Sequence, residues 1–146
     1  MPSLGARGDT ASHVPHAASP VAATLATLPP GVLLRLEGVA LCGIAVLLYG
    51  WLGGGWWWFA VLLLVPDVGL LGYLLGPRHG ARLYNLTHTL VVPAVLGAVG
   101  LGLGAPTAVL LALVWAAHIG MDRALGYGLK YPGAFADTHL QRVAGP

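Results

Sequence analysis

A histidine and an aspartate stand four residues apart at the end of a long apolar run. His118 and Asp122 occur in the stretch WAAHIGMDRAL, directly after PTAVLLALV. In an α-helix, residues at positions i and i+4 project from the same face. An imidazole and a carboxylate on one face are ligands that divalent transition metals accept. The pair therefore marks one side of a candidate metal site.

Three further ionisable side chains stand inside other apolar runs. Glu37 lies in the first run, Asp67 follows Pro66 in the second, and His88 lies in the third. A proline inside a helix removes one backbone hydrogen bond, so Pro66 is expected to kink the helix and to aim Asp67 or free a carbonyl oxygen as a ligand. Ionisable groups within a bilayer are costly unless they face the protein interior and pair. We therefore expect these side chains to meet one another.

The composition indicates that lipid is the main solvent of this chain. Of its 146 residues, 57% are hydrophobic and 8% are charged, whereas soluble domains carry about 25% charged residues. The formal net charge of +2 gives no reason to expect a nucleic-acid partner. The single cysteine, Cys42, permits no disulfide within the chain and no thiolate metal cluster. We expect the lipid bilayer as the partner, and the sequence leaves a homo-oligomer open.

Four apolar segments are long enough to cross a bilayer as helices. They cover residues 31–51, 56–75, 82–103 and 106–125, and about 20 residues span a hydrocarbon core of about 30 Å. The joints LGGG, GPRHGA and GAP are short, so consecutive helices are expected to run antiparallel. The predicted fold is an all-α, integral membrane four-helix bundle. We divide it into a flexible tail at 1–30, a transmembrane domain at 31–126 and a cytoplasmic tail at 127–146.

The basic residues predict the orientation of the bundle. All seven lysines and arginines fall on one side of the four predicted spans, and the two joints on the other side carry none. The positive-inside rule makes the basic side cytoplasmic, and tryptophans favour the membrane interface. Trp51 and the cluster at 56–58 then lie at the opposite face. We expect a multi-pass protein of the inner (plasma) membrane with both termini in the cytoplasm.

Helical rise places the ionisable side chains at nearly one depth. At about 1.5 Å per residue, Glu37, Asp67, His88 and His118 lie roughly 9–12 Å from the cytoplasmic helix ends, and Asp122 one turn nearer the water. We predict Glu37 and Asp67 as catalytic carboxylates. The predicted metal ligands are Asp67, His88, His118 and Asp122, with Arg35, Tyr84, Asn85 and Arg123 as supporting residues.

This mixture of carboxylates and imidazoles suits Zn²⁺, Mn²⁺ or Fe²⁺, and Mg²⁺ if oxygen ligands dominate. Such an ion would serve hydrolysis of a lipid-like or amphiphilic substrate, with a carboxylate such as Glu37 as general base or as support for a ligand. Three other interpretations stay open. They are a network that only fixes helix packing, a proton or cation relay, and a haem held between His88 and His118. The apolar outer halves of the spans argue against a relay through one molecule.

Small residues recur at a spacing of four, a pattern that lets helices approach closely in lipid. Gly72 and Gly76 form one such row, and Ala116, Gly120 and Ala124 form another. After the last span, Lys130 lies between Tyr127 and Tyr131, which fits an anchor at the membrane interface. Alternatively, Asp137 and His139 fold back over the mouth of the site.

Several motifs resemble a known family. They are RLEG (35–38), PD (66–67), GYLLGPRHGARLYNLTHT (72–89), HIGMDRALGYGLKY (118–131) and DTHL (137–140). Together they resemble an uncharacterised bacterial family of small four-helix membrane proteins, classed as a domain of unknown function. The likeness spans residues 31–142 and implies the fold without an activity.

The order of PD, TH and H-x-x-x-D is similar, more distantly, to the membrane-bound metal-dependent hydrolase family. This resemblance implies that Asp67, His88, His118 and Asp122 form the metal site of a hydrolase. That family usually has another histidine five residues before the TH histidine, where this chain has Leu83.

Overall fold

The computed structural model describes residues 19–133 and 137–144, and this part of the chain is helical without strands. Its helices are α1 (Pro20–Ala26), α2 (Pro30–Trp51), α3 (Trp56–Leu63), the 3₁₀ helix η1 (Val65–Leu75), α4 (Pro77–His88), α5 (Val91–Gly102), α6 (Pro106–Leu125) and α7 (His139–Ala144). Four stretches are long and apolar enough to cross a membrane: Pro30–Trp51, Trp56–Leu75, Pro77–Gly102 and Pro106–Leu125. The prediction of an all-α membrane bundle is confirmed.

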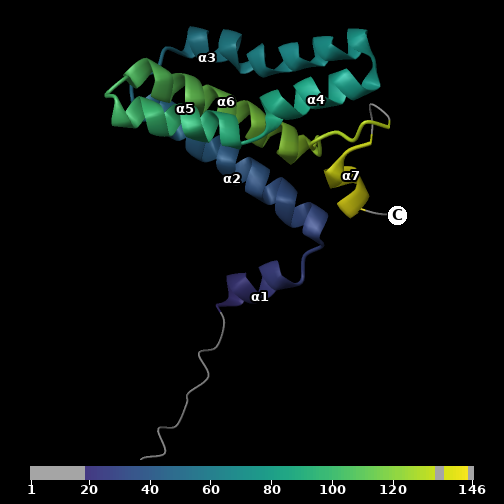
Figure 1. Ribbon diagram of the computed structural model, residues 1–146. Helices are drawn as coiled ribbons and strands as arrows, with labels where there is room; N and C mark the ends of the chain where they lie inside the picture. The colour runs from purple at the N-terminus through teal and green to yellow at the C-terminus, as the bar shows by residue number, and fades with distance from the viewer. Residues whose placement is uncertain (1–18, 134–136, 145–146) are drawn as a thin grey trace, which may run out of the picture.

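The helices form two groups. The first, which we call the scaffold, consists of α2, α5 and α6, with α2 and α5 both packed along α6. The second, which we call the hairpin, consists of η1 and α4, which pack against each other. In Figure 1, α3 and η1 continue as one rod and α4 returns beneath it, while α2 crosses on the other side of α6.

The crossing of α2 and α6 depends on two glycines. A Cβ atom on Gly120 would lie 2.7 Å from the backbone nitrogen of Cys42 and 2.8 Å from the carbonyl oxygen of Gly38. A Cβ atom on Gly38 would in turn lie 2.6 Å from the backbone nitrogen of Ala124. Residues without a side chain therefore permit the close backbone approach that stabilises helix pairs in lipid.

The second span changes its helix type at Pro66. α3 ends at Leu63, and η1 continues as a 3₁₀ helix with Pro66 in its first turn. Proline has no N–H to continue the α-helical ladder, and a 3₁₀ helix has three residues per turn. Its buried residues accordingly recur every three positions, at Pro66, Gly69 and Gly72. Gly69 and Gly72 pack on α4, whereas Gly76 of the predicted four-residue row lies in the turn after η1, where a Cβ atom would meet nothing within 4 Å. The four-residue spacing assumed an α-helix, and η1 has three residues per turn.

The third span begins earlier than predicted and is broken in the middle. Gly76 alone makes the turn, with φ at 103°, and α4 begins at Pro77 rather than at residue 82. Proline is well tolerated at the first helical position, because its missing N–H has no partner there. α4 ends at His88, Thr89 is extended, and α5 begins at Val91. The break lets one span contribute its first half to the hairpin and its second half to the scaffold.

Two elements lie in the segments predicted as tails. In the segment 1–30, residues 1–18 lie outside the described residues, and α1 occupies Pro20–Ala26. After α6, Gly126 adopts a left-handed conformation with φ at 94°, which ends the helix. The following chain forms an isolated antiparallel bridge between Lys130 and Thr138 before α7. We call residues 127–133 with 137–144 the strap.

Candidate metal centre

Four ionisable side chains meet where the hairpin faces α6. They are Asp67 on η1, His88 at the end of α4, and His118 and Asp122 on α6, and one ligand atom from each lies within 4.8 Å of the others. The His118 side chain is 0% exposed and that of His88 is 3% exposed, whereas Asp122 is 14% and Asp67 40% exposed. The cluster is therefore closed on its imidazole side and accessible on its Asp67 side.

The separations that involve the two imidazoles are close to those of a tetrahedral site. The two imidazole Nε2 atoms lie 3.0 Å apart. The Nε2 atom of His88 lies 3.4 Å from Asp67 Oδ1 and 3.3 Å from Asp122 Oδ2, and the Nε2 atom of His118 lies 3.6 and 3.8 Å from the same oxygens. Ligands about 2.0–2.1 Å from one ion at tetrahedral angles are separated by roughly 3.3 Å. These five of the six separations lie on both sides of that value, and the sixth, between Asp67 and Asp122, is no longer than 4.8 Å.

The hydrogen bonds of the His88 ring fit the tautomer that a metal ligand needs. Its Nδ1 atom lies 2.9 Å from the carbonyl oxygen of Tyr84 and 2.9 Å from the hydroxyl of Thr87. A carbonyl oxygen only accepts, so Nδ1 carries the proton and donates it to Tyr84. The Nε2 lone pair then faces the other imidazole and two carboxylate oxygens, and such a bond from the second nitrogen is typical of metal-binding histidines.

Tyr84 supports both a histidine and a carboxylate of the cluster. Its ring stacks on His88 with 3.7 Å between centroids and 13° between planes. Its hydroxyl donates to Asp122 Oδ2 at 3.1 Å. The ammonium group of Lys130 also lies over the Tyr84 ring, 4.7 Å from its centroid. A cation at this distance from an aromatic ring is attracted to its π face.

The strap covers the hairpin side of the cluster. Asn85 forms two hydrogen bonds with the backbone of Lys130, donating to its oxygen at 2.9 Å and accepting from its nitrogen at 2.7 Å. Lys130 is only 6% exposed, and its ammonium group lies over the ring of Tyr84. Burial lowers the pKa of the Lys130 ammonium group, and the charge of Asp122 opposes this shift.

The two polar residues of the strap that the alternative interpretation placed over the mouth of the site have other partners. Asp137 accepts two hydrogen bonds from Arg142, at 2.7 and 2.5 Å. His139 accepts from the backbone nitrogen of Leu129 at 2.9 Å, and its own backbone nitrogen donates to Leu129 at 3.1 Å. Neither belongs to the four-residue cluster.

A cavity of about 10 Å³ remains beside Tyr84, His88 and Asp122, which is room for about one water molecule.

Glu37 is not brought to the cluster. It lies exposed on α2, and the group of candidate ligands does not include it. Arg35 is also exposed, and its guanidinium group lies against Gly126, while the Cβ atom of Arg123 packs against Gly38. The structure thus groups the four predicted ligands and Tyr84, and places Asn85 at the strap.

Two residues beside the cluster were not singled out from the sequence. Trp115 donates from Nε1 to the carbonyl oxygen of Thr87 at 2.6 Å. In a continuous helix this oxygen would accept from the backbone nitrogen of Val91, but that nitrogen donates to the hydroxyl of Thr89 at 3.5 Å. Pro93 was the sequence signal for this break, because its nitrogen cannot donate a hydrogen bond to the carbonyl of Thr89, as a continuous helix requires.

A haem between the two histidines does not fit this geometry. Axial ligation places two nitrogens on opposite faces of the macrocycle, about 4 Å apart. The Nε2 atoms of His88 and His118 are 3.0 Å apart, and their rings meet edge to face at 64°. There is no space for a porphyrin between them.

Comparison with known proteins gives a family without an activity. The family model described as Domain of unknown function (DUF4260) matches residues 31–143. Neither the curated proteins nor the solved structures yield a match to this chain. The likeness to membrane-bound metal-dependent hydrolases finds no support in these comparisons. Since this family model matches most of the length of the chain, the chain belongs to the DUF4260 family.

Proposed function

We propose that this protein binds one divalent metal ion through Asp67, His88, His118 and Asp122 and uses it to hydrolyse an amphiphilic, lipid-like substrate. The observation that carries the proposal is that the imidazole Nε2 atoms lie 3.0 Å apart and 3.3–3.8 Å from the two carboxylate oxygens, with all four ligand atoms within 4.8 Å of one another. Two nitrogen and two oxygen ligands suit Zn²⁺, Mn²⁺ or Fe²⁺ better than Mg²⁺, which prefers an octahedron of oxygens.

When bound, such an ion acidifies water and polarises the oxygen of a carbonyl or phosphoryl group. The chain's own residues supply the rest of the chemistry. Asp67 is the most exposed of the four and meets a substrate first, so we assign it the role of general base alongside that of ligand. Asp67 takes a proton from the water as the water oxygen bonds to the carbonyl carbon or phosphorus. The bond to the leaving oxygen then breaks, and that oxygen takes up the proton from Asp67.

The residues around the other ligands also support a metal site. Tyr84 holds Asp122 through a hydrogen bond and keeps the His88 ring in place by stacking. The cavity of about 10 Å³ beside these residues has the size of one water molecule. Glu37 has no part in this proposal, because its exposed side chain lies outside the cluster.

A second function is favoured by one specific observation. The 3.0 Å between the two Nε2 atoms is also a hydrogen-bond distance. One shared proton between His88 and His118, with Asp67 and Asp122 as acceptors, would make the cluster a packing or proton-handling network.

Elemental analysis of the full chain purified in detergent distinguishes the two functions. We expect one equivalent of a transition metal, lost in His118→Ala and Asp122→Ala. The control is Glu37→Gln, which changes a carboxylate outside the cluster and is expected to keep the metal. Circular dichroism checks that each variant retains its helices. No metal after reconstitution with Zn²⁺, Mn²⁺ or Fe²⁺ would refute the metal site and favour the proton network.

Activity is tested separately on the metal-loaded protein with chromogenic esters and phosphoesters that carry an alkyl chain. We expect product release that needs the metal and is lost in Asp67→Asn. A bound metal without turnover of either class would overturn the hydrolase while leaving the metal site intact.

A further inference from the structure

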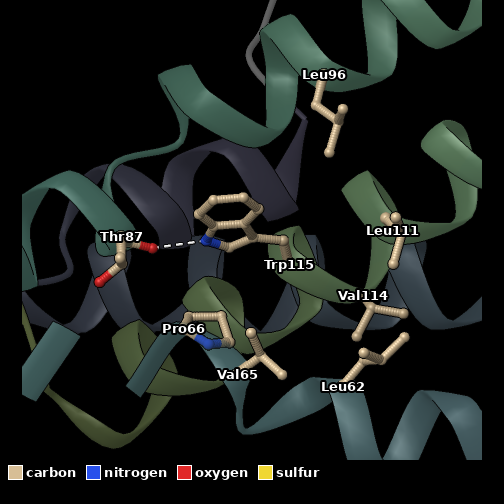
Figure 2. Close-up of a pocket in the computed structure, with 8 residues that line it drawn as sticks. All are labelled: Leu62, Val65, Pro66, Thr87, Leu96, Leu111, Val114 and Trp115. Carbon is tan, nitrogen blue, oxygen red and sulfur yellow. Dashed lines mark hydrogen bonds between the residues drawn. The ribbon is translucent and has the colours of Figure 1, made fainter. Parts of the chain in front are cut away.

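An apolar cavity adjoins the metal centre. Its volume is about 270 Å³, and its lining residues come from α3, η1, α4, α5 and α6. Figure 2 shows Leu96 approaching from one side and Leu62, Val65 and Pro66 from the other, with the indole ring of Trp115 between them.

A neighbouring cavity lies toward the opposite end of the bundle. A second cavity, of about 330 Å³, is lined by Tyr49, Trp58 and Thr107 among others. The two cavities share Leu62, Leu111 and Val114 in their walls. We call the two together the apolar cleft. Along α6 it follows residues 107–115, a length of roughly 12 Å at the helical rise.

The polar atoms in the wall of the first cavity are already engaged. The carbonyl oxygen of Thr87 accepts from Trp115 Nε1, as the dashed line in Figure 2 marks. The hydroxyl of Thr87 bonds to the backbone oxygens of Leu83 and Tyr84, at 3.2 and 3.1 Å. The remaining lining side chains of this cavity are hydrocarbon. A ligand here finds only apolar contacts, so it must itself be hydrocarbon.

One end of the cleft lies near the metal centre. Pro66 and Thr87 line the cavity and directly precede the ligands Asp67 and His88 in the chain. Val114, also in the wall, lies one helical turn before His118 on the same face of α6. One end of the cleft therefore lies within one residue or one helical turn of three of the ligands, although none of the four ligands lines either cavity.

From this geometry we propose that the apolar cleft binds one acyl chain of a membrane lipid, with the head end of the chain at the metal centre. The inference rests on the proposed hydrolysis of an amphiphile and names its substrate class: a lipid whose scissile bond lies at the head end of a single acyl chain. Dry apolar cavities bind apolar ligands, and in a bilayer acyl chains are the abundant hydrocarbon. The combined volume suits one chain and is too small for a helix, whose diameter is about 10–12 Å.

Photolabelling of the full chain in lipid nanodiscs tests the proposal without needing metal or turnover. One phospholipid probe carries a diazirine near the head end of its acyl chain, and another carries it at the chain terminus. We expect the first to label α6 near Trp115 and the second to label it near Thr107 or α3 near Trp58. The labelled residues are identified by mass spectrometry.

Two variants block the cleft. Leu111→Trp and Leu62→Trp each place an indole in the wall that the two cavities share. Each is expected to lower labelling about tenfold, the loss that displacement of about two methylene groups produces. Leu47→Trp makes the same exchange on α2, where Leu47 is exposed, and is expected to leave labelling unchanged.

Failure of this proposal and of the metal proposal are distinguishable. Two results would overturn the acyl-chain site whatever the metal content. One is labelling in the reverse order. The other is equal labelling of the cleft and of the outer surface of α2, unchanged in Leu111→Trp and Leu62→Trp. Ordered labelling that both variants lower would support it, and would stand even if elemental analysis found no metal.

Discussion

The scaffold and the hairpin are held in the protein by different means. In the scaffold, α2 and α6 approach until their backbones touch at Gly38 and Gly120. The hairpin has extensive contacts within itself but few between its backbone and α6. It is joined to α6 by side chains: the hydrogen bonds Tyr84 to Asp122 and Trp115 to Thr87, and the four-residue cluster.

The difference has a physical cause and a functional consequence. Lipid tails are as apolar as leucine, so helices associate in a bilayer through close packing of small residues or through polar contacts. The scaffold uses the first means and the hairpin the second. Because the four-residue cluster takes side chains from both η1–α4 and α6, an ion bound there would tie the hairpin to the scaffold.

Removal of the metal should show this difference most strongly. An ion present at a thousand times its dissociation constant stabilises the folded state by about 4 kcal/mol. Chelation should therefore lower the thermal unfolding midpoint, and hydrogen exchange should increase in η1 and α4 more than in α2. Exchange that rises equally in all helices would contradict the separation into scaffold and hairpin.

A methyl group at the crossing should damage the scaffold instead. Gly120→Ala places a Cβ atom 2.7 Å from the backbone nitrogen of Cys42, so the helices must separate. Overpacking of this kind costs about 1–3 kcal/mol, measured as a lower midpoint of thermal unfolding in detergent. Gly43→Ala on α2 is the matched control, because a Cβ atom there meets nothing within 4 Å. Equal midpoints for the two variants would show that the close crossing is not what holds α2 to α6.

The smallest effect is expected from a substitution where the hairpin meets α6. Tyr84→Phe keeps the ring that stacks on His88 and removes the hydroxyl that donates to Asp122. Loss of such a supporting hydrogen bond lowers metal affinity about 10-fold, measurable by competition with a chromophoric chelator. Tyr127→Phe removes a hydroxyl from an exposed ring and should leave the affinity unchanged. An unchanged affinity in Tyr84→Phe would mean that the hydroxyl does not support the ligand.

Length, hydropathy and residue type sufficed to predict the four spans and the side chains of the cluster. A run of about 20 apolar residues has few alternatives to a membrane helix, and the end of the last span, Leu125, agrees with the prediction. His118 and Asp122 share a face because helical periodicity alone requires it. Depth also follows from counting residues, which is why Asp67 and His88 were expected at the level of His118.

Rotation about the helix axes could not be predicted in the same way. A helix in lipid is apolar on all sides, so the sequence of α2 carries no periodic signal that tells the inner face from the outer one. Glu37 therefore had the right depth for the cluster but lies exposed. The orientation of Asp67 depended on the 3₁₀ geometry after Pro66, which changes the angle per residue.

The contacts of the strap belong to tertiary structure in the same sense. Lys130 lies 45 residues after Asn85, and the two hydrogen bonds between them depend on where α4 and α6 end in space. The sequence by itself determined which chemistry is present in this membrane protein and at what depth. Only the packing of the hairpin on α6 decided which side chains meet, because contacts between distant segments depend on helix rotation and on the breaks at Pro66 and Thr89.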